Sequence, residues 1–410
     1  MDSGDTAWML TSSALVLFMT PGLAFFYAGM VRSRNALGML MYNFFAIGLV
    51  GVIWAVVAYS LAFGDSGNAL IGNLDHIGLA DIGGMYGGED GTFPLILFAA
   101  FQMTFAVITP ALISGAVADR MKFSAWAWFI GIWVVLVYAP VAHWVWGGGW
   151  IAELGALDFA GGAVVHINAG AAALAAAIVL GKRKGWPREA MPPHSLPFTL
   201  LGAGILMFGW FGFNAGSALA ADDIAAQAFI NTFLAASAAM LGWLLVERIK
   251  SGHPTTLGAA SGVVGGLVAI TPCAGFVEAW ASMIIGAIAG ALCYLAVSLK
   301  FRLGYDDSLD VVGVHLVGGL VGSLLLGLFA TEAVNGAVVD EGLFVGGGAT
   351  LLGYQAVASF ATLAFSFVVS FVILKVIDLV IGIRVTEEDE DVGLDTTQHA
   401  ETAYALAGRI

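Results

Sequence analysis

The sequence has 410 residues, of which 60% are hydrophobic and only 11% carry a charged side chain. No water-soluble fold can bury an apolar fraction of that size, so the composition predicts a protein whose solvent is the lipid bilayer. The formal net charge of −14 disfavours nucleic acid and anionic lipid patches as partners.

Apolar runs near the length that crosses a bilayer as a helix, about 20 residues, recur along the chain. They are too long and continuous for the strands of a membrane barrel, whereas a helix satisfies its own backbone polar groups. We therefore predict an all-α polytopic membrane protein with eleven transmembrane helices. In chain order they are expected at residues 7–31, 40–63, 93–117, 124–146, 161–181, 198–219, 225–246, 256–273, 278–299, 311–330 and 346–377.

The basic residues predict the orientation. All 15 Lys and Arg fall on one side of this arrangement, and an error of one span would scatter them. The positive-inside rule makes that side cytoplasmic. We expect a multi-pass protein of the plasma (inner) membrane with its N-terminus outside and its C-terminus in the cytoplasm. The outer loops hold acids without cations, which either draw cations to the mouth or only keep the loops soluble.

A faint internal repeat divides the chain. FFYAG at 25–29 has a counterpart in FGFNAG at 211–216, and GGAVVHINAG at 161–170 has one in VVGVHLVGG at 311–319. Because each half contains an odd number of spans, the halves 7–181 and 198–330 must have inverted topology, and inverted repeats place a site near the bilayer midplane. The span at 346–377 lies outside this 5+5 repeat.

His166 and His315 occupy matching positions in the two halves. A titratable residue within a span is a functional candidate, although a single such histidine could equally well bond a neighbouring helix. Neither has an acid or base within a helical turn, so we expect two neutral rings, each with one donor and one acceptor nitrogen. Glycines crowd around both. The pattern predicts a narrow apolar passage for a small uncharged molecule, not for hydrated ions.

A cation site is predicted at the outer end of this passage. Asp158 lies before the span of His166 and is expected to cap it as an N-terminal acid. Singly, each nearby aromatic is explained as well by core packing or an interfacial belt. Together, aromatic faces and a hydroxyl could bind a small cation by cation–π attraction. The side chains concerned are Phe101, Phe105, Trp146, Phe213 and Ser217.

These residues and their surroundings resemble the ammonium transporter family of Amt, Mep and Rh proteins, and specifically its Amt branch. The resemblance covers nearly the whole chain. It is carried by TPGLAFFYAG (20–29), FQMTFA (101–106), ITPALISGAVADRMKF (108–123), AHWVWGGG (142–149), ALDFAGGAVVHINAG (156–170), GWFGFNAGSA (209–218) and DVVGVHLVGG (310–319).

The resemblance implies a role for each candidate residue. It implies ammonium recruitment by Phe101, Trp146 and Ser217, a phenylalanine gate of Phe105 and Phe213, twin pore histidines at His166 and His315, and structural support of the site by Asp158. It also implies a homotrimer with one pore per subunit.

The residues and the resemblance agree on ammonium uptake. NH4+ would bind at the mouth and lose a proton, and NH3 would pass the histidines; whether the proton crosses separately stays open. Alternatives are a neutral NH3, methylamine or gas channel, and an ammonium sensor or transceptor. For such a sensor we expect an appended signalling domain, which the residues after 384 do not hold. No HExxH, GxSxG or paired catalytic acid lies within a span, so we expect neither an enzyme nor a cofactor or metal site.

Residues 385–410 form a predicted cytoplasmic regulatory tail behind the membrane domain at 1–384. The tail opens with the acidic run VTEEDED, while the cytoplasmic loops are basic. Opposite charge would draw the tail onto that surface, so we expect it to be ordered, although charge runs are usually solvated. The resemblance further implies contact with a neighbouring subunit and a platform for a PII-type nitrogen regulatory protein. Ala400 stands where the family is expected to have glycine, which costs backbone freedom there.

Overall fold

The computed structural model describes residues 1–64 and 67–404, which form helices joined by loops. Within these ranges no β-strand is formed, and there are only two isolated β-bridges. The α-helices are α1 Ser3–Met30, α2 Ala36–Ile53, α3 Tyr59–Phe63, α4 Leu95–Val117, α5 Phe123–Trp133, α6 Ala139–Trp146, α7 Trp150–Leu154, α8 Asn168–Leu180, α9 Leu196–Ala215, α10 Asp223–Ser251, α11 Thr256–Ile270, α12 Ala279–Leu303, α13 Val317–Phe329, α14 Thr350–Ile381, α15 Glu387–Val392 and α16 Leu394–His399.

Shorter helices of other types interrupt or join them. The π-helices are η2 Trp54–Ala58, η5 Val134–Tyr138, η6 Gly162–Ile167 and η8 Val312–Leu316. The 3₁₀ helices are η1 Ser33–Asn35, η3 Ile77–Leu79, η4 Gly88–Asp90, η7 Gly216–Ala218 and η9 Leu343–Val345.

Ten helical segments among the described residues are long and apolar enough to cross a membrane. They coincide with ten of the predicted spans. The second begins at Ser33 rather than 40, whereas α6 ends the fourth at Trp146, as predicted, and α7 follows after a break at residues 147–149. The predicted span at 256–273 corresponds to α11, which has 15 residues. At 1.5 Å per residue such a helix covers about 22 Å, less than a typical hydrocarbon core of about 30 Å. The chain is therefore all-helical and multi-pass, and the count of eleven spans stays a prediction.

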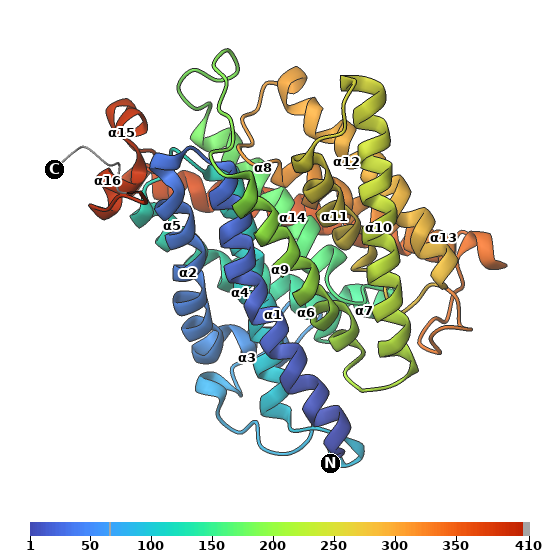
Figure 1. Cartoon of the computed structure of the whole chain (residues 1–410). Coiled ribbons are helices and arrows are strands. Elements are labelled where there is room, and N and C mark those ends of the chain that lie inside the picture. The colour runs from blue at the N-terminus through green and yellow to red at the C-terminus, as the bar shows by residue number, and fades with distance from the viewer. Residues whose placement is uncertain (65–66, 405–410) are drawn as a thin grey trace.

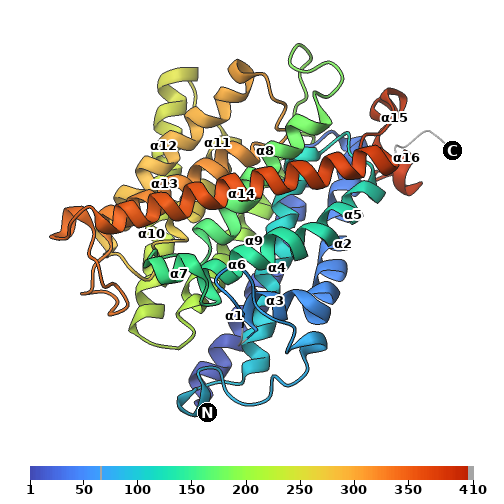
Figure 2. The ribbon, with the colours of Figure 1, turned by 180° about the vertical axis from the view of Figure 1, so that it is seen from behind.

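The first helices of the two predicted halves, α1 and α9, pack side by side, as Figure 1 shows. Figure 2 shows α14 running obliquely across the other face of the bundle, where it packs against α5, α8 and α13. The N-terminus lies at one end of the bundle, and α15 and α16 lie at the opposite end (Figure 1). This placement is what an odd number of crossings requires.

The two halves meet through glycines. A Cβ atom added to Gly170 on α8 would lie 2.4 Å from the backbone nitrogen of Leu316 in η8. One added to Gly202 on α9 would lie 2.2 Å from the backbone nitrogen of Phe26 on α1. Distances this short exclude any side chain, so small residues at these crossings allow the helices to approach closely.

The two histidines lie in π-helices of matching construction. In each segment an acid stands eight residues before the histidine, Asp158 before His166 and Asp307 before His315. Five residues before each histidine the backbone is left-handed, at Gly161 with φ 118° and at Asp310 with φ 66°. Single π-turns occur often at functional sites. The shared construction is what the predicted repeat would produce.

The tail is folded against the bundle up to residue 404, as its charge pattern predicted; its last six residues, 405–410, lie outside the described residues. Glu390 is buried and accepts hydrogen bonds from the Arg384 guanidinium Nε at 2.7 Å and from the Lys184 backbone nitrogen at 3.0 Å. The Asp395 carboxylate accepts a bond of 2.8 Å from the Gly38 nitrogen at the start of α2. Ala400 has a left-handed φ of 55°, a conformation that costs a non-glycine residue about 1–2 kcal/mol.

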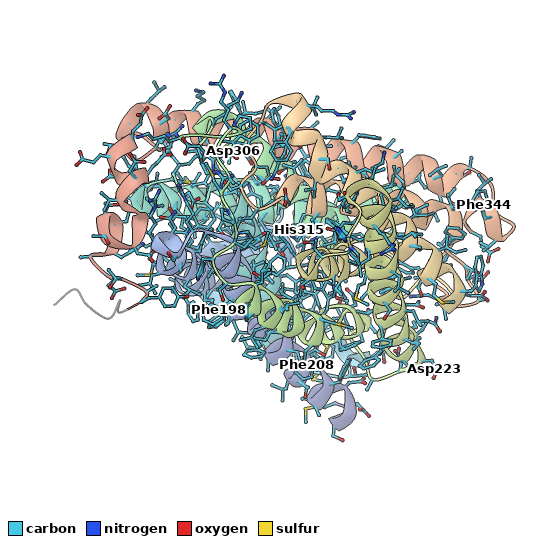
Figure 3. All side chains as sticks on the ribbon, turned by 45° about the horizontal axis from the view of Figure 1, so that its top comes forward. Phe198, Phe208, Asp223, Asp306, His315 and Phe344 are labelled. Carbon is cyan, nitrogen blue, oxygen red and sulfur yellow. The ribbon has the colours of Figure 1, made fainter. Side chains whose placement is uncertain are left out.

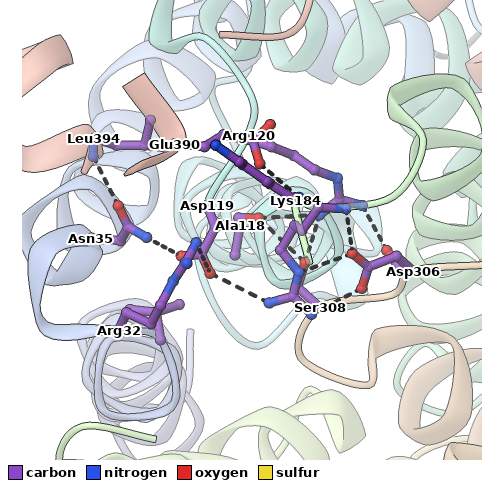
Figure 4. A network of polar contacts seen from close by, with 12 residues as sticks. Arg32, Asn35, Ala118, Asp119, Arg120, Lys184, Asp306, Ser308, Glu390 and Leu394 are labelled. Atoms are coloured by element: carbon purple, nitrogen blue, oxygen red, sulfur yellow. Dashed lines mark hydrogen bonds and ion pairs between the residues drawn. The ribbon is translucent and has the colours of Figure 1, made fainter. Parts of the chain in front are cut away.

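A buried polar network joins the tail to the loops at the same end of the bundle (Figure 4). The Leu394 backbone donates to Asn35, which in turn bonds Asp119. Asp119 also pairs with Arg183 at 3.4 Å, and Arg183 pairs with Asp306 at 2.9 Å. Arg120 donates hydrogen bonds to the Asp306 carbonyl and the Ser308 hydroxyl. Burial lowers the pKa of Arg120 to about 10. That side chain still carries its charge at neutral pH, so the network holds four loops together.

Candidate functional site

The two histidines meet in the interior of the bundle, where Figure 3 labels His315. The Nδ1 atoms of His166 and His315 are 3.3 Å apart, and the rings lie 5.3 Å apart between centroids. Two neutral rings can share this bond only if one Nδ1 donates and the other accepts. The pair then offers one Nε2–H donor and one bare Nε2 acceptor. His166 Nε2 is buried and has no hydrogen-bond partner among the described residues.

The space beside this pair is small and apolar. It measures about 10 Å³, close to what a single water-sized molecule needs. Besides the two histidines it is lined by Met19, Leu23, Phe26, Ile108, Leu112, Val165, Leu206, Trp210, Phe213 and Val264. His315 also lines a second space of about 10 Å³, whose lining includes Tyr27, Ser261 and Asp310. One histidine is thus shared by two cavities, each with room for one small solute.

Two phenylalanine rings close one side of the histidine cavity. The centroids of Phe105 and Phe213 are 4.2 Å apart and both side chains are buried. Phe213 also lines the histidine cavity, while Phe105 contacts Phe101 at 4.9 Å and Trp146 at 6.0 Å. The resemblance implied this pair as a gate. In this structure the rings are in contact, so a solute must displace them to reach His166.

A cleft of about 460 Å³, at the end of the pore that we predict to face outward, lies beyond these rings. Its lining brings together Phe101, Trp146 and Ser217, the three residues expected to recruit ammonium, and also Asp158. The Ser217 hydroxyl donates to the Phe213 carbonyl at 2.8 Å, which leaves lone pairs on its oxygen as acceptors. The cleft therefore combines aromatic faces with a hydroxyl acceptor, the groups that a small cation with N–H donors can use.

Asp158 caps the π-helix that carries His166, as expected from its position. Its carboxylate accepts four backbone N–H bonds, from Gly161 at 2.8 Å, Gly162 at 2.6 Å, Ala163 at 2.8 Å and Val164 at 3.2 Å. Its backbone oxygen accepts a bond of 2.9 Å from the Trp146 indole. Asp158 therefore fixes both the Trp146 ring and the start of the helix that carries His166.

Two residues of this region were not singled out from the sequence. Trp210 stacks on His166 at 5.5 Å and donates its indole N–H to Thr271 at 2.9 Å, so it holds the ring plane of that histidine. Its position three residues before Phe213 on one helix was the available signal. Asp307 is the second: its carboxylate caps η8 by accepting from the Val312 nitrogen at 2.7 Å. The repeated spacing of eight residues between acid and histidine could have identified it.

Comparison with known proteins places this arrangement in a family. The model of the Ammonium Transporter Family matches residues 7–404. An ammonium transporter of Bacillus subtilis is 54% identical over 405 residues, covering 98% of this chain and 99% of that protein. The crystal structure of Candida albicans Mep2 has a TM-score of 0.89 at 38% identity, covering 95% of this chain and 88% of that one. A structure described as a sensor Amt protein has a TM-score of 0.89 at 29% identity, covering 97% and 98%. The chain therefore belongs to the ammonium transporter family, whose members are transporters and not enzymes.

Proposed function

We propose that this ammonium transporter binds NH4+ in the outer cleft, releases a proton there and conducts NH3 past His166 and His315. One observation carries the proposal: a pair of buried, hydrogen-bonded histidines stands in an apolar cavity of about 10 Å³ behind two phenylalanine rings that contact each other. A charge at the centre of a membrane costs about 2.5 kcal/mol or more. No acid lines this cavity to offset that cost for NH4+.

Deprotonation removes this obstacle. NH4+ loses one proton to water in the outer cleft, and the remaining NH3 is neutral and about the size of water. Within the pore NH3 donates to the bare imidazole nitrogen and accepts from the protonated one. The histidine pair thus replaces the hydrogen bonds that NH3 leaves behind in water. The proton either stays outside, which makes transport electrically silent, or crosses separately, which makes it electrogenic.

The outer cleft selects the cation before this step. The Trp146 and Phe101 rings offer π faces, Ser217 offers an oxygen acceptor, and the Asp158 carboxylate adds negative charge at the mouth. A cation–π contact contributes about 0.5–2 kcal/mol. Methylammonium carries the same N–H donors and a positive charge, so we expect it to compete for this cleft.

The assembly around the pore is also part of the proposal. We place the chain in the plasma membrane as a homotrimer, with eleven crossings, the N-terminus outside and the tail in the cytoplasm. In the eighth crossing α11 is continued by the turns at 271–277, which supply the missing length. The membrane domain then comprises residues 1–384, and the regulatory tail at 385–410 offers the docking platform for a PII-type protein.

A sensor that conducts little is the alternative function, because a sensor Amt protein is among the similar structures. An ammonium pulse on a solid-supported membrane with the reconstituted chain separates the possibilities, when combined with uptake of ¹⁵N-ammonium into vesicles. Uptake with current indicates electrogenic transport, and uptake without current indicates an NH3 channel. Neither current nor uptake would contradict the proposed function and favour the sensor.

A further inference from the structure

The two ends of the pore differ in how their acids are compensated. At the outer end, all four hydrogen bonds to the Asp158 carboxylate come from backbone N–H groups. At the inner end, Asp310 lines the cavity below His315, and its Oδ1 lies 2.5 Å from the ammonium nitrogen of Lys300. Among the described residues no Lys or Arg forms a salt bridge with Asp158. The outer acid therefore lacks the fixed cation that the inner one has.

Lys300 is held firmly in this place. Its Nζ also donates to the backbone oxygen of Asp307 at 2.8 Å, and its side chain is only 9% exposed. It stands seven residues before the capping acid Asp307, and the residue at the same distance before Asp158 is the buried Ile151. At this sequence distance from the capping acid, the second half thus has a cation and the first half an apolar side chain.

The chemistry of the Lys300 side chain suggests what the fixed cation at the inner end does. Its terminal group is an alkylammonium, with the same charge and the same kind of N–H donors as NH4+. It occupies the position beside Asp310 that an ammonium ion would otherwise take, once NH3 leaving the pore has accepted a proton from water at the inner mouth. A second cation there would meet repulsion from Lys300 instead of an uncompensated carboxylate.

We propose that Lys300 acts as a tethered substitute for ammonium that keeps the inner mouth from retaining the transported ion. The outer mouth, with its aromatic cleft and an acid that has no fixed cation beside it, binds ammonium; the inner mouth, already occupied by Lys300, releases it. Lys300 is a positioning residue, because it makes the affinity for ammonium lower at the inner mouth than at the outer mouth. The inference rests on the proposed transport function.

The test compares the two faces of the full-length protein in proteoliposomes whose orientation is assigned by protease cleavage of the tail. Initial ¹⁵N-ammonium uptake is measured against outer ammonium and, separately, against ¹⁴N-ammonium loaded inside. In Lys300→Met, the luminal concentration that halves uptake should fall about two- to fivefold, the range of a partly exposed ion pair. The outer half-saturating concentration should not change.

Two further variants separate charge from structure. Lys300→Arg should keep the wild-type response, and Lys300→Met combined with Asp310→Asn should restore it, because the uncompensated acid is gone. Equal luminal inhibition in wild type and Lys300→Met would overturn the proposal, as would a double variant that behaves like Lys300→Met. If Lys300→Met does not fold, Asp310→Asn alone should weaken luminal inhibition, and an unchanged response would overturn the proposal. Absence of any uptake by the wild type would instead contradict the transport function itself.

Discussion

Replacing Asp158 by Asn tests how far the pore depends on one capping carboxylate. Four backbone N–H groups point at its two oxygens, at 2.6–3.2 Å. Asparagine has the same shape but only one oxygen, so its amide N–H₂ would face two of the four donors. Hydrogen bonds to a charged group contribute about 1.5–3 kcal/mol each, and losing two costs about 3–6 kcal/mol. That is a large fraction of the 5–15 kcal/mol by which a typical domain is stable.

The loss of these hydrogen bonds should affect both segments that Asp158 contacts. The π-turn of His166 loosens, and the Trp146 indole loses the fixed position of its acceptor. We expect Asp158→Asn to lower the unfolding temperature in detergent and to reduce ammonium uptake at least tenfold. Asp340→Asn, the same change at an exposed acid of an outer loop, is the matched control and should alter neither quantity. Wild-type uptake and unfolding temperature in Asp158→Asn would refute the reasoning.

Three further changes probe other parts of the account. Trp146→Leu removes a π face from the outer cleft, so the half-saturating ammonium concentration should rise severalfold to tens of times; an unaltered dependence removes Trp146 from the site. Deleting residues 385–410 removes the contacts of Glu390 and Asp395, and it should reduce or deregulate transport while the bundle stays folded. A truncated protein that conducts and is inhibited like the full chain would show that the tail has no role in transport or its regulation. Burial raises the pKa of Asp307 to about 6, against about 4 in an unfolded chain. Between pH 4 and pH 6 the Asp307 carboxyl therefore keeps its proton in the folded protein but loses it in the unfolded chain. Its contribution to the free energy of unfolding is fully present below pH 4 and is lost as pH rises to 6. The unfolding temperature of wild type relative to Asp307→Asn should therefore fall between pH 4 and 6, and a constant difference would contradict this burial effect.

The fold was largely predictable because lipid imposes simple rules. A long apolar run in a bilayer must be helical, and ten predicted spans have their helices. The boundaries were harder to predict, because apolar composition does not mark where a helix begins or ends: the second segment begins at Ser33 rather than 40, and α10 continues to Ser251 rather than 246. The sequence did not predict that α11 is short, because apolar composition does not reveal where a helix ends and turns begin. Residues 271–277 are as apolar as the helix before them.

The candidate site was accessible where side-chain chemistry is unusual for a membrane interior. His166 and His315 stood out by type and by repeat, and the structure brings their nitrogens to 3.3 Å. The π-helical backbone of the His166 segment was not predictable, because four N–H groups converge there on the Asp158 carboxylate, an arrangement without a sequence period. Trp210 was hidden for a different reason: a tryptophan on an apolar helix is ordinary, and only the stacking on His166 gives it a role.

The central claim is that nitrogen crosses as NH3 and never as a cation. Potassium tests it most directly, because it is close to ammonium in size and charge but has no proton to lose. Uptake of ¹⁵N-ammonium and of K⁺ is measured side by side in vesicles containing the wild type, His166→Ala or His315→Ala. The account predicts ammonium uptake without K⁺ uptake in the wild type, and lost or less selective uptake in each variant. Potassium entry at a rate comparable with ammonium in the wild type, or unchanged rate and selectivity in both variants, would contradict it.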